Sequence, residues 1–247
     1  MPKAAALIAA LLLAVAPHLA AAAEFSITPI RLEFERGARS AAVTVSNDDA
    51  RPLRMQLRLM AWSQDADGAD VYRDSDELVY FPRMLTVQPG EKRLVRVGLK
   101  SPAGAAERTY RLYLDELPDS AQPKASGLNF TIRFALPIFL PAALEAGPSG
   151  AIEGLALHGG KLRVAVRNTG NRHFRIATVA ARSAQGSPQG FAAEAPGWYL
   201  LPGASRIHTI EIPAEVCRGL RRLDVTVKAD KLSLEGGLDV EPGMCAP

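Results

Sequence analysis

Apolar residues recur at every second position through most of this chain, and that period limits the fold more than any other feature of the sequence. Residues 53–59 alternate Leu, Met, Leu and Leu with Arg, Gln and Arg, and residues 162–167 repeat the pattern with Leu, Val and Val. Such alternation predicts β-strands with one buried face. After residue 23 no stretch has the apolar spacing of a helix, so the sequence predicts an all-β protein.

Short strands and turns follow one another along the rest of the chain. The sequence contains 20 glycines and 18 prolines, and turn sequences such as Asn47-Asp48-Asp49 and Gln88-Pro89-Gly90-Glu91 separate the apolar runs. Further strands are expected at 43–46, 78–81, 84–87, 94–97, 110–114, 128–139, 174–178, 209–212 and 223–227. Many short strands at regular spacing are typical of β-sandwiches.

The N-terminus has the pattern of a secretory signal peptide. Within residues 1–23, Lys3 precedes an apolar run, Ala4–Ala16, and Ala21–Ala23 supply an A-x-A cleavage site. The alternative is a membrane anchor, but a Pro-His pair interrupts the run before the ~20 apolar residues that a bilayer span needs. We therefore expect a mature chain that begins near Glu24, lies outside the cytoplasm in the periplasm, and has no membrane span.

A change in composition near residue 141 predicts a boundary between two domains. Residues 141–150 are rich in Ala, Pro, Gly and Ser, which is typical of a linker. The two halves show no detectable sequence repeat. We divide the chain into a signal peptide (1–23), a first domain (24–142), a linker (143–150) and a second domain (151–247).

Charge and motifs argue against nucleic-acid binding and catalysis. The chain has 29 basic and 26 acidic residues, a net charge of +3, too small for a nucleic-acid-binding stripe. His158, His173 and His208 lack metal-site spacing, so we expect isolated surface or strand histidines. There is no G-x-S-x-G elbow or P-loop, and the acidic loop at 65–70 lacks the EF-hand spacing. We expect no enzyme activity, cofactor, metal or small-molecule substrate.

Cys217 and Cys245 are the only cysteines. An even pair in an oxidising compartment predicts one disulfide. Two free thiols are the alternative.

The landmarks of the chain resemble those of PapD-like periplasmic pilus chaperones over essentially the whole mature sequence. They are Ile30-Arg31-Leu32, Val43–Asn47, Leu85–Glu91, Leu94–Val97, Arg108–Tyr113, Glu116–Pro118 and Val166–Phe174. The last of these is similar to the second domain of chaperones from the archaic, spore-coat-U-like branch. Their order and spacing carry the resemblance, since none is specific alone.

This resemblance implies a fold and a function. The fold is two immunoglobulin-like β-sandwich domains in a boomerang arrangement. The function is binding of pilus or coat-fibre subunits by donor-strand complementation, in which the chaperone lends a strand to a strand-deficient partner, followed by delivery to an outer-membrane usher. The first alternative is a secreted immunoglobulin-like structural or adhesive protein. A hydrolase on a sandwich scaffold is another, and it would need a nucleophile and a base that converge in one pocket.

The last strand of the first domain is the expected donor strand. Leu128, Phe130, Ile132 and Phe134 occupy alternate positions and so point to one side. In a donor strand they would fill the groove of the subunit. In an ordinary sandwich strand they would face the core of their own domain.

Basic residues are the expected anchor for the C-terminal carboxylate of the subunit, since a guanidinium fork matches a carboxylate. Arg31 aligns with the first-strand cation of the family. The last-strand lysine of the better-known branch has no counterpart, because the alignment puts Pro137 there. Arg133 has the right parity, and Arg111 on the preceding strand is a further candidate. For each of the three, the alternative is a solvated position on a strand face.

Overall fold

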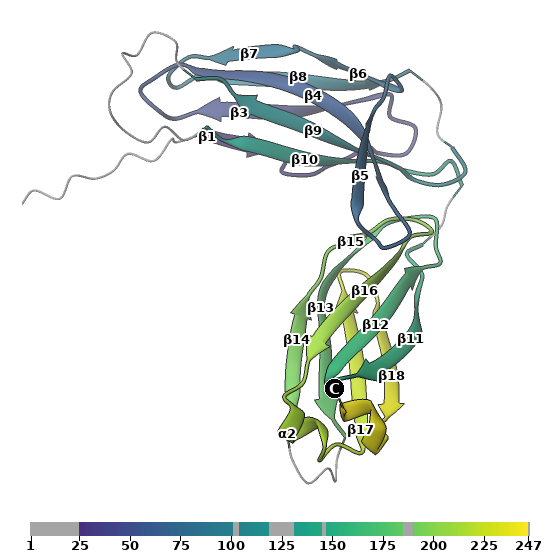
Figure 1. The fold of residues 1–247 in the computed structure, drawn as a ribbon. Helices are drawn as coiled ribbons and strands as arrows, with labels where there is room; N and C mark the ends of the chain where they lie inside the picture. Colours follow the sequence, from purple (N-terminus) through teal and green to yellow (C-terminus); the bar gives the residue numbers. More distant parts are fainter. Residues whose placement is uncertain (1–24, 101–103, 119–130, 145–146, 185–189, 247) are drawn as a thin grey trace, which may run out of the picture.

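Two β-sandwiches meet at an angle, like the arms of a boomerang (Figure 1). The computed structural model describes residues 25–100, 104–118, 131–144, 147–184 and 190–246. The expected signal peptide lies outside these residues, as do Leu128 and Phe130 of the expected donor strand.

The first sandwich has a four-stranded and a six-stranded sheet. The four-stranded sheet has the order β1 (Phe25–Thr28), β3 (Ser40–Asn47), β8 (Lys92–Leu99) and β6 (Leu78–Phe81). The six-stranded sheet has the order β2 (Leu32–Glu33), β10 (Arg133–Leu140), β9 (Arg108–Glu116), β4 (Leu53–Gln64) and β5 (Asp70–Asp74), and β7 (Met84–Val87) also pairs with β4.

The core of the first sandwich follows the alternation of the sequence. Met55, Leu57 and Leu59 of β4 are buried, whereas Gln56 and Arg58 between them are exposed. Val43 and Val45 of β3 face them from the other sheet and are fully buried. Burying each such side chain contributes about 1.5–3 kcal/mol to folding.

The second sandwich pairs a three-stranded with a five-stranded sheet. The three-stranded sheet has the order β11 (Gly150–His158), β12 (Lys161–Asn168) and β16 (Ser205–Glu211). The five-stranded sheet has the order β14 (Ala192–Pro196), β13 (Phe174–Ser183), β17 (Arg222–Ala229) and β18 (Ser233–Asp239), and β15 (Tyr199–Leu200) also pairs with β13.

A disulfide between Cys217 and Cys245 closes the far end of the second sandwich. Cys217 ends the short helix α2 (Ala214–Cys217), and Cys245 ends the 3-10 turn η1 (Pro242–Cys245). Both cysteines are buried in the core of this sandwich. The bond thus ties the C-terminal segment to the sheets.

An asparagine ends β3 in the first sandwich and β12 in the second, and plays the same role in both. Asn47 accepts a hydrogen bond from the backbone of Asp49 and donates from its amide to two carbonyls. Asn168 accepts one from Gly170, and its amide donates to the carbonyls of Arg172 and Leu200. The second asparagine therefore fixes the loop that runs toward the first sandwich.

The strands of the six-stranded sheet are buried on both faces where they approach the second sandwich. Four successive residues of β9, Thr109 to Leu112, are buried, and so are the last five residues of β10. In β4 the buried parity changes after Leu59, so that Trp62 points away from the first core. This switch from alternating to continuous burial marks the domain junction.

Candidate functional site

Aromatic side chains from both sandwiches form a small separate core at the junction. Trp62 of β4, Phe139 of β10 and Leu201 after β15 are buried together, with Tyr199 against them. The Trp62 ring meets Phe139 at 6.0 Å and Tyr199 edge-on at 5.5 Å. Such ring pairs contribute about 0.5–1.5 kcal/mol beyond their buried area, so this core stabilises one relative position of the domains.

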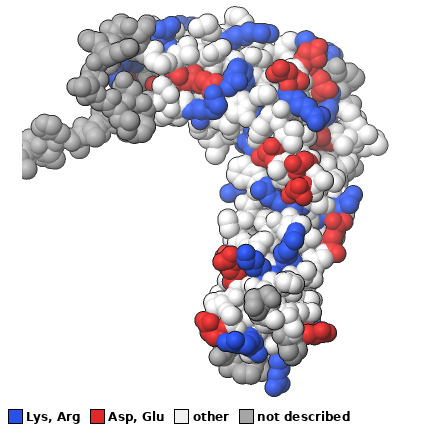
Figure 2. All heavy atoms as spheres, in the orientation of Figure 1, with Lys and Arg blue, Asp and Glu red and all other residues white. Residues whose placement is uncertain are grey.

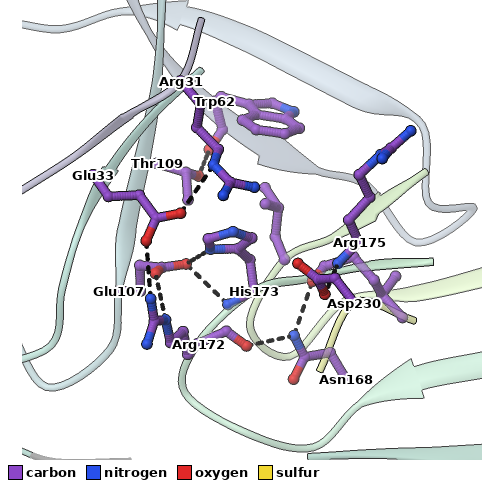
Figure 3. A network of polar contacts seen from close by, with 12 residues as sticks. Arg31, Glu33, Trp62, Glu107, Thr109, Asn168, Arg172, His173, Arg175 and Asp230 are labelled. Atoms are coloured by element: carbon purple, nitrogen blue, oxygen red, sulfur yellow. Dashed lines mark hydrogen bonds and ion pairs between the residues drawn. The ribbon is translucent and has the colours of Figure 1, made fainter. Parts of the chain in front are cut away.

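Charged side chains of alternating sign connect the two sandwiches beside that core (Figure 3). Arg31 pairs with Glu33 at 2.9 Å, and Glu33 pairs with Arg172 of the second sandwich at 3.0 Å. The Arg172 Nε lies 3.9 Å from Glu107, which also accepts hydrogen bonds from the backbone N–H and Nδ1 of His173. We call these five residues the junction chain.

The buried end of the junction chain corrects one expectation from the sequence. His173 is not an isolated surface or strand histidine. It is fully buried, its ring stacks on Phe139 at 3.5 Å, and Glu107 is 2% exposed. Loss of either partner would leave the other buried without its hydrogen bond, which is costly.

The hairpin between β4 and β5 reaches across to the second sandwich. The Gln64 amide donates to the carbonyl of Tyr199 and accepts from the N–H of Leu201. At the hairpin tip, Gly68 has φ +77°, and a Cβ there would lie 2.6 Å from the Ser205 carbonyl. Only glycine fits that approach. The hairpin therefore acts as a third contact that fixes the domain angle.

Arg111 of β9 lies beside the aromatic core at the domain junction and is 5% exposed. Its guanidinium stacks on the Trp62 ring at 3.9 Å. One nitrogen makes a long 3.4 Å contact with the Ala135 carbonyl. Among the described residues, no carboxylate forms an ion pair with Arg111. A buried cation without an anionic partner is the most unusual electrostatic feature of this sheet.

Arg133 lies on the same face of the sheet in a different environment. Its side chain is 61% exposed and pairs with Asp115, which also binds Arg58 at 3.0 Å. Partial burial acts to raise the pKa of Asp115, but hydrogen bonds from Arg133 and Arg58 hold it below the usual value. Arg133 is thus an exposed cation that already has a carboxylate partner.

Arg31 and Arg111 lie on either side of Pro137, the residue that we expect from the sequence at the family's lysine position. Pro137 of β10 pairs with Arg111 of β9. On the other side Ile138 pairs with Leu32, so Arg31, one residue earlier, continues that register opposite Pro137. The side chain of Arg31 is 40% exposed and shares Glu33 with Arg172. Arg31, just before β2, and Arg111 of β9 thus lie in register on opposite sides of Pro137.

The outer edge of β10 has no partner over its first half among the strands that the structure describes. β9 pairs with β10 along residues 133–140, whereas β2 covers only Ile138 and Phe139 on the other side. No other described strand pairs with residues 133–137 along that edge. Unpaired strand edges present backbone donors and acceptors that another chain can use.

The two described members of the expected donor run differ in their surroundings. Phe134 is partly buried and packs against the first core, on the same side as Leu136 and Ile138. Ile132, just before β10, is 40% exposed. Of the two described members, Phe134 thus belongs partly to the domain's own core, whereas Ile132 is exposed to solvent.

The described residues show no sign of a metal site or a membrane span. They contain no group of three or more His, Cys, Asp and Glu that could hold a metal ion. Within the same residues, no helix is long and apolar enough to cross a bilayer.

A groove of about 760 Å³ opens between the sandwiches, with Trp62, Glu107 and Arg167 among its walls. Acidic and basic side chains are interspersed on the face in Figure 2.

Comparisons with known proteins agree with this architecture. Residues 24–145 match the family described as "Pili and flagellar-assembly chaperone, PapD N-terminal domain". A search of curated proteins found no match.

Solved structures of pilus chaperones share the fold over most of the chain. One is the CsuC–CsuE chaperone–tip adhesion subunit pre-assembly complex from the archaic chaperone–usher Csu pili of Acinetobacter baumannii, with a TM-score of 0.63 and 19% identity over 86% of this chain and 98% of that one. Another is the Pseudomonas aeruginosa CupB2 chaperone, with a TM-score of 0.52 and 15% identity over 87% and 100%. A third is the Salmonella enterica SafA pilin in complex with the SafB chaperone, with a TM-score of 0.52 and 16% identity over 88% and 97%.

The fold is thus that of the two-domain β-sandwich pilus chaperones. The chain belongs to the PapD-like chaperone family, and its first sandwich is the family's N-terminal domain.

Proposed function

We propose that this protein is a periplasmic chaperone that holds pilus or coat-fibre subunits by donor-strand complementation and passes them to an outer-membrane usher. Binding and folding energies drive this cycle, in keeping with a sequence that has no ATP-binding motif. The subunit leaves the chaperone when another strand replaces β10, and the folding energy of the completed subunit drives the exchange. The solved relatives that carry a pilin or a tip subunit support this proposal.

The buried guanidinium of Arg111, which has no carboxylate partner in the part of the chain that the structure describes, carries the proposal. A cation that is withdrawn from water and has no internal carboxylate is stabilised by an anionic ligand. The C-terminal carboxylate of a subunit has the shape that a guanidinium fork binds with two parallel hydrogen bonds. Arg31, on the other side of Pro137, is the second donor of this anchor. We assign Arg133 a lesser part because it is exposed and paired with Asp115.

The open edge of β10 supplies the surface for strand addition. A subunit strand that pairs with residues 133–137 gains main-chain hydrogen bonds, and the exposed side chain of Ile132 just before β10 gives its groove a side-chain contact. Ile132 is the described residue that serves this purpose, and we extend the role to Leu128 and Phe130. Phe134 contributes through the core of its own domain as well as through any groove contact.

Capture of a subunit in the native host tests the proposal. The affinity-tagged chaperone is purified from a periplasmic extract while fibres are being made, and co-purified proteins are identified by mass spectrometry. We expect a small subunit that aggregates without the chaperone. The variant Ile132→Asp should lose this subunit, because desolvating an unpaired charge against the apolar groove costs roughly several kcal/mol.

A matched variant distinguishes strand donation from nonspecific binding to exposed apolar side chains. Leu94 is 52% exposed on β8 of the opposite sheet, and Leu94→Asp should capture the subunit as the wild type does. Equal loss in both variants would contradict the role of Ile132. A protein that forms homophilic assemblies and binds no strand-deficient subunit would favour the structural or adhesive alternative.

A further inference from the structure

The only two tryptophans of the chain, Trp62 and Trp198, both stack around Arg111. The Arg111 Cζ lies 3.9 Å from the Trp62 ring centre, and 5.8 Å from those of Trp198 and Tyr199. The rings also contact one another, with Tyr199 edge-on to both tryptophans at 5.5 and 5.7 Å. We call these three residues the aromatic cage.

We propose that the aromatic cage takes the place of a salt-bridge partner and holds the Arg111 guanidinium ready for a carboxylate, with Trp198 as the positioning residue that the second domain contributes. This inference rests on the anchor role of Arg111 in the proposed function. It adds that the anchor is assembled across the two domains, so that carboxylate recognition depends on their relative position.

Aromatic faces suit this task because they stabilise a guanidinium without occupying its hydrogen-bond donors. The planar, weakly hydrated guanidinium stacks on rings, and the attraction to a ring face persists when water is excluded. A carboxylate partner would instead take the fork, as Asp115 does for Arg133 and Arg58. The cage therefore keeps Arg111 buried and oriented while its fork remains available.

A hydrogen bond to the first domain fixes Trp198, a cage ring that the second domain contributes. The Trp198 indole N–H donates to Asp70 of β5 at 2.9 Å, and Asp70 also accepts from the Tyr72 hydroxyl and the Gln64 amide. Trp198 is 39% exposed, so it closes the outer side of the cage, whereas the buried Trp62 closes the inner side. A change in the domain angle would withdraw Trp198 and Tyr199 from Arg111.

The test compares two forms of one probe on the intact mature protein. The probe is a short acetylated peptide of alternating valine and threonine, with either a free C-terminal carboxylate or a C-terminal amide. The measured quantity is the ratio of the two dissociation constants. The wild type should prefer the carboxylate, and Arg111→Leu should erase that preference.

Trp198→Leu should lower the preference about three- to tenfold, the range of a partly exposed cation–π contact, and leave the affinity for the amide unchanged. Trp198→Phe, which keeps a ring, should retain most of the preference. Arg58→Leu is the matched control, because the Arg58 guanidinium stacks on Tyr113 outside the cage. This variant should prefer the carboxylate peptide as strongly as the wild type does. Circular dichroism confirms the fold of each variant.

Each other result overturns a defined part of the argument. Suppose that Arg111→Leu erases the preference for the carboxylate. If Trp198→Leu then leaves this preference unchanged, or weakens the binding of both peptides equally, the proposed role of the aromatic cage is wrong and the anchor role of Arg111 stands. If the wild type binds both peptides alike, or Arg111→Leu keeps the preference, anchor and cage fail together while strand addition stands. If neither peptide binds, strand addition at β10 fails as well.

Discussion

Arg111 and Arg133 lie on one face of one sheet, on neighbouring strands, and yet have opposite surroundings. Arg111 is buried among rings with no carboxylate partner among the described residues, whereas Arg133 is solvated and paired with Asp115. Both are arginines of suitable parity near the expected donor strand. The comparison teaches that charge and strand position alone do not separate the two arginines, whereas burial and the lack of a described carboxylate partner do, and the proposed anchor role of Arg111 rests on that difference.

The largest expected effect comes from removing each arginine in turn. Arg111→Ala should weaken subunit capture by two to three orders of magnitude, since losing one partner of a buried charge pair costs about 3–5 kcal/mol. Arg133→Ala should change it less than about fivefold, as an exposed pair contributes about 0–1 kcal/mol. Titration of a purified subunit against each variant measures both. The reverse order of effects would contradict the comparison.

Amidation of the subunit's C-terminus sharpens the same experiment. If Arg111 binds the carboxylate, then Arg111→Ala should have almost no further effect on an amidated subunit, because both changes remove one interaction. Arg31→Ala should behave in the same way with a smaller effect, since Glu33 already occupies part of its fork. Simple addition of the two losses would place the carboxylate elsewhere.

Alternation along the chain was sufficient to predict the β-sandwich fold, because a strand with one buried face has apolar residues at every second position. The strands expected at 78–81 and 84–87 correspond to β6 and β7, and the first-half landmarks were sufficient to predict the family. The long strand expected at 128–139 is described over Arg133–Leu140. The expected signal peptide and domain boundaries stay predictions.

The junction could not be predicted in the same way, because its contacts join residues far apart in the chain. Glu107 and His173 are separated by 66 positions, and nothing near His173 in the sequence identifies its partner. One signal was present. Trp62 is out of phase with the apolar residues of β4 before it, and an aromatic residue of the wrong parity indicates a second buried face.

Ile132 and Phe134 offer a second comparison, between an exposed and a partly buried member of the donor run. Phe134→Ala should lower the free energy of unfolding by about 2 kcal/mol, less than a fully buried Phe would, because it packs against the core of the first sandwich. Ile132→Ala should change it by less than about 0.5 kcal/mol. Urea denaturation of the free chaperone measures both. Equal destabilisation would mean that Ile132 also serves the domain core.

The junction chain allows the same contrast between buried and exposed acids. Glu107→Gln should destabilise the protein by about 1–3 kcal/mol, since the buried carboxylate accepts two hydrogen bonds from His173. Glu33→Gln should cost only about 0–1 kcal/mol, as Glu33 is a third exposed. Calorimetric unfolding compares the two variants. If Glu33→Gln were the more harmful, the ion pairs at the surface would hold the junction instead.

The smallest expected effect is a weak dependence of stability on acid pH that arises at Asp115. The arginines on either side hold the pKa of Asp115 below its usual value in the folded protein. A lowered folded pKa gives stability that is complete above the unfolded value, about pH 4, and is lost as the pH falls through the folded value. Because this ion pair is partly solvated, the loss should stay below about 1 kcal/mol.

Asp115→Asn should remove this contribution, so the variant and the wild type should differ in unfolding free energy at pH 6 and converge near pH 2. The substitution also frees the forks of Arg133 and Arg58. If an unoccupied fork is what makes an arginine on this sheet bind a carboxylate, then Asp115→Asn should make capture more sensitive to Arg133→Ala than it is in the wild type. It should still be far less sensitive than to Arg111→Ala, since Arg133 remains solvated. An Arg133 that rivals Arg111 once Asp115 is neutral would show that the internal carboxylate, and not burial, separates the two arginines.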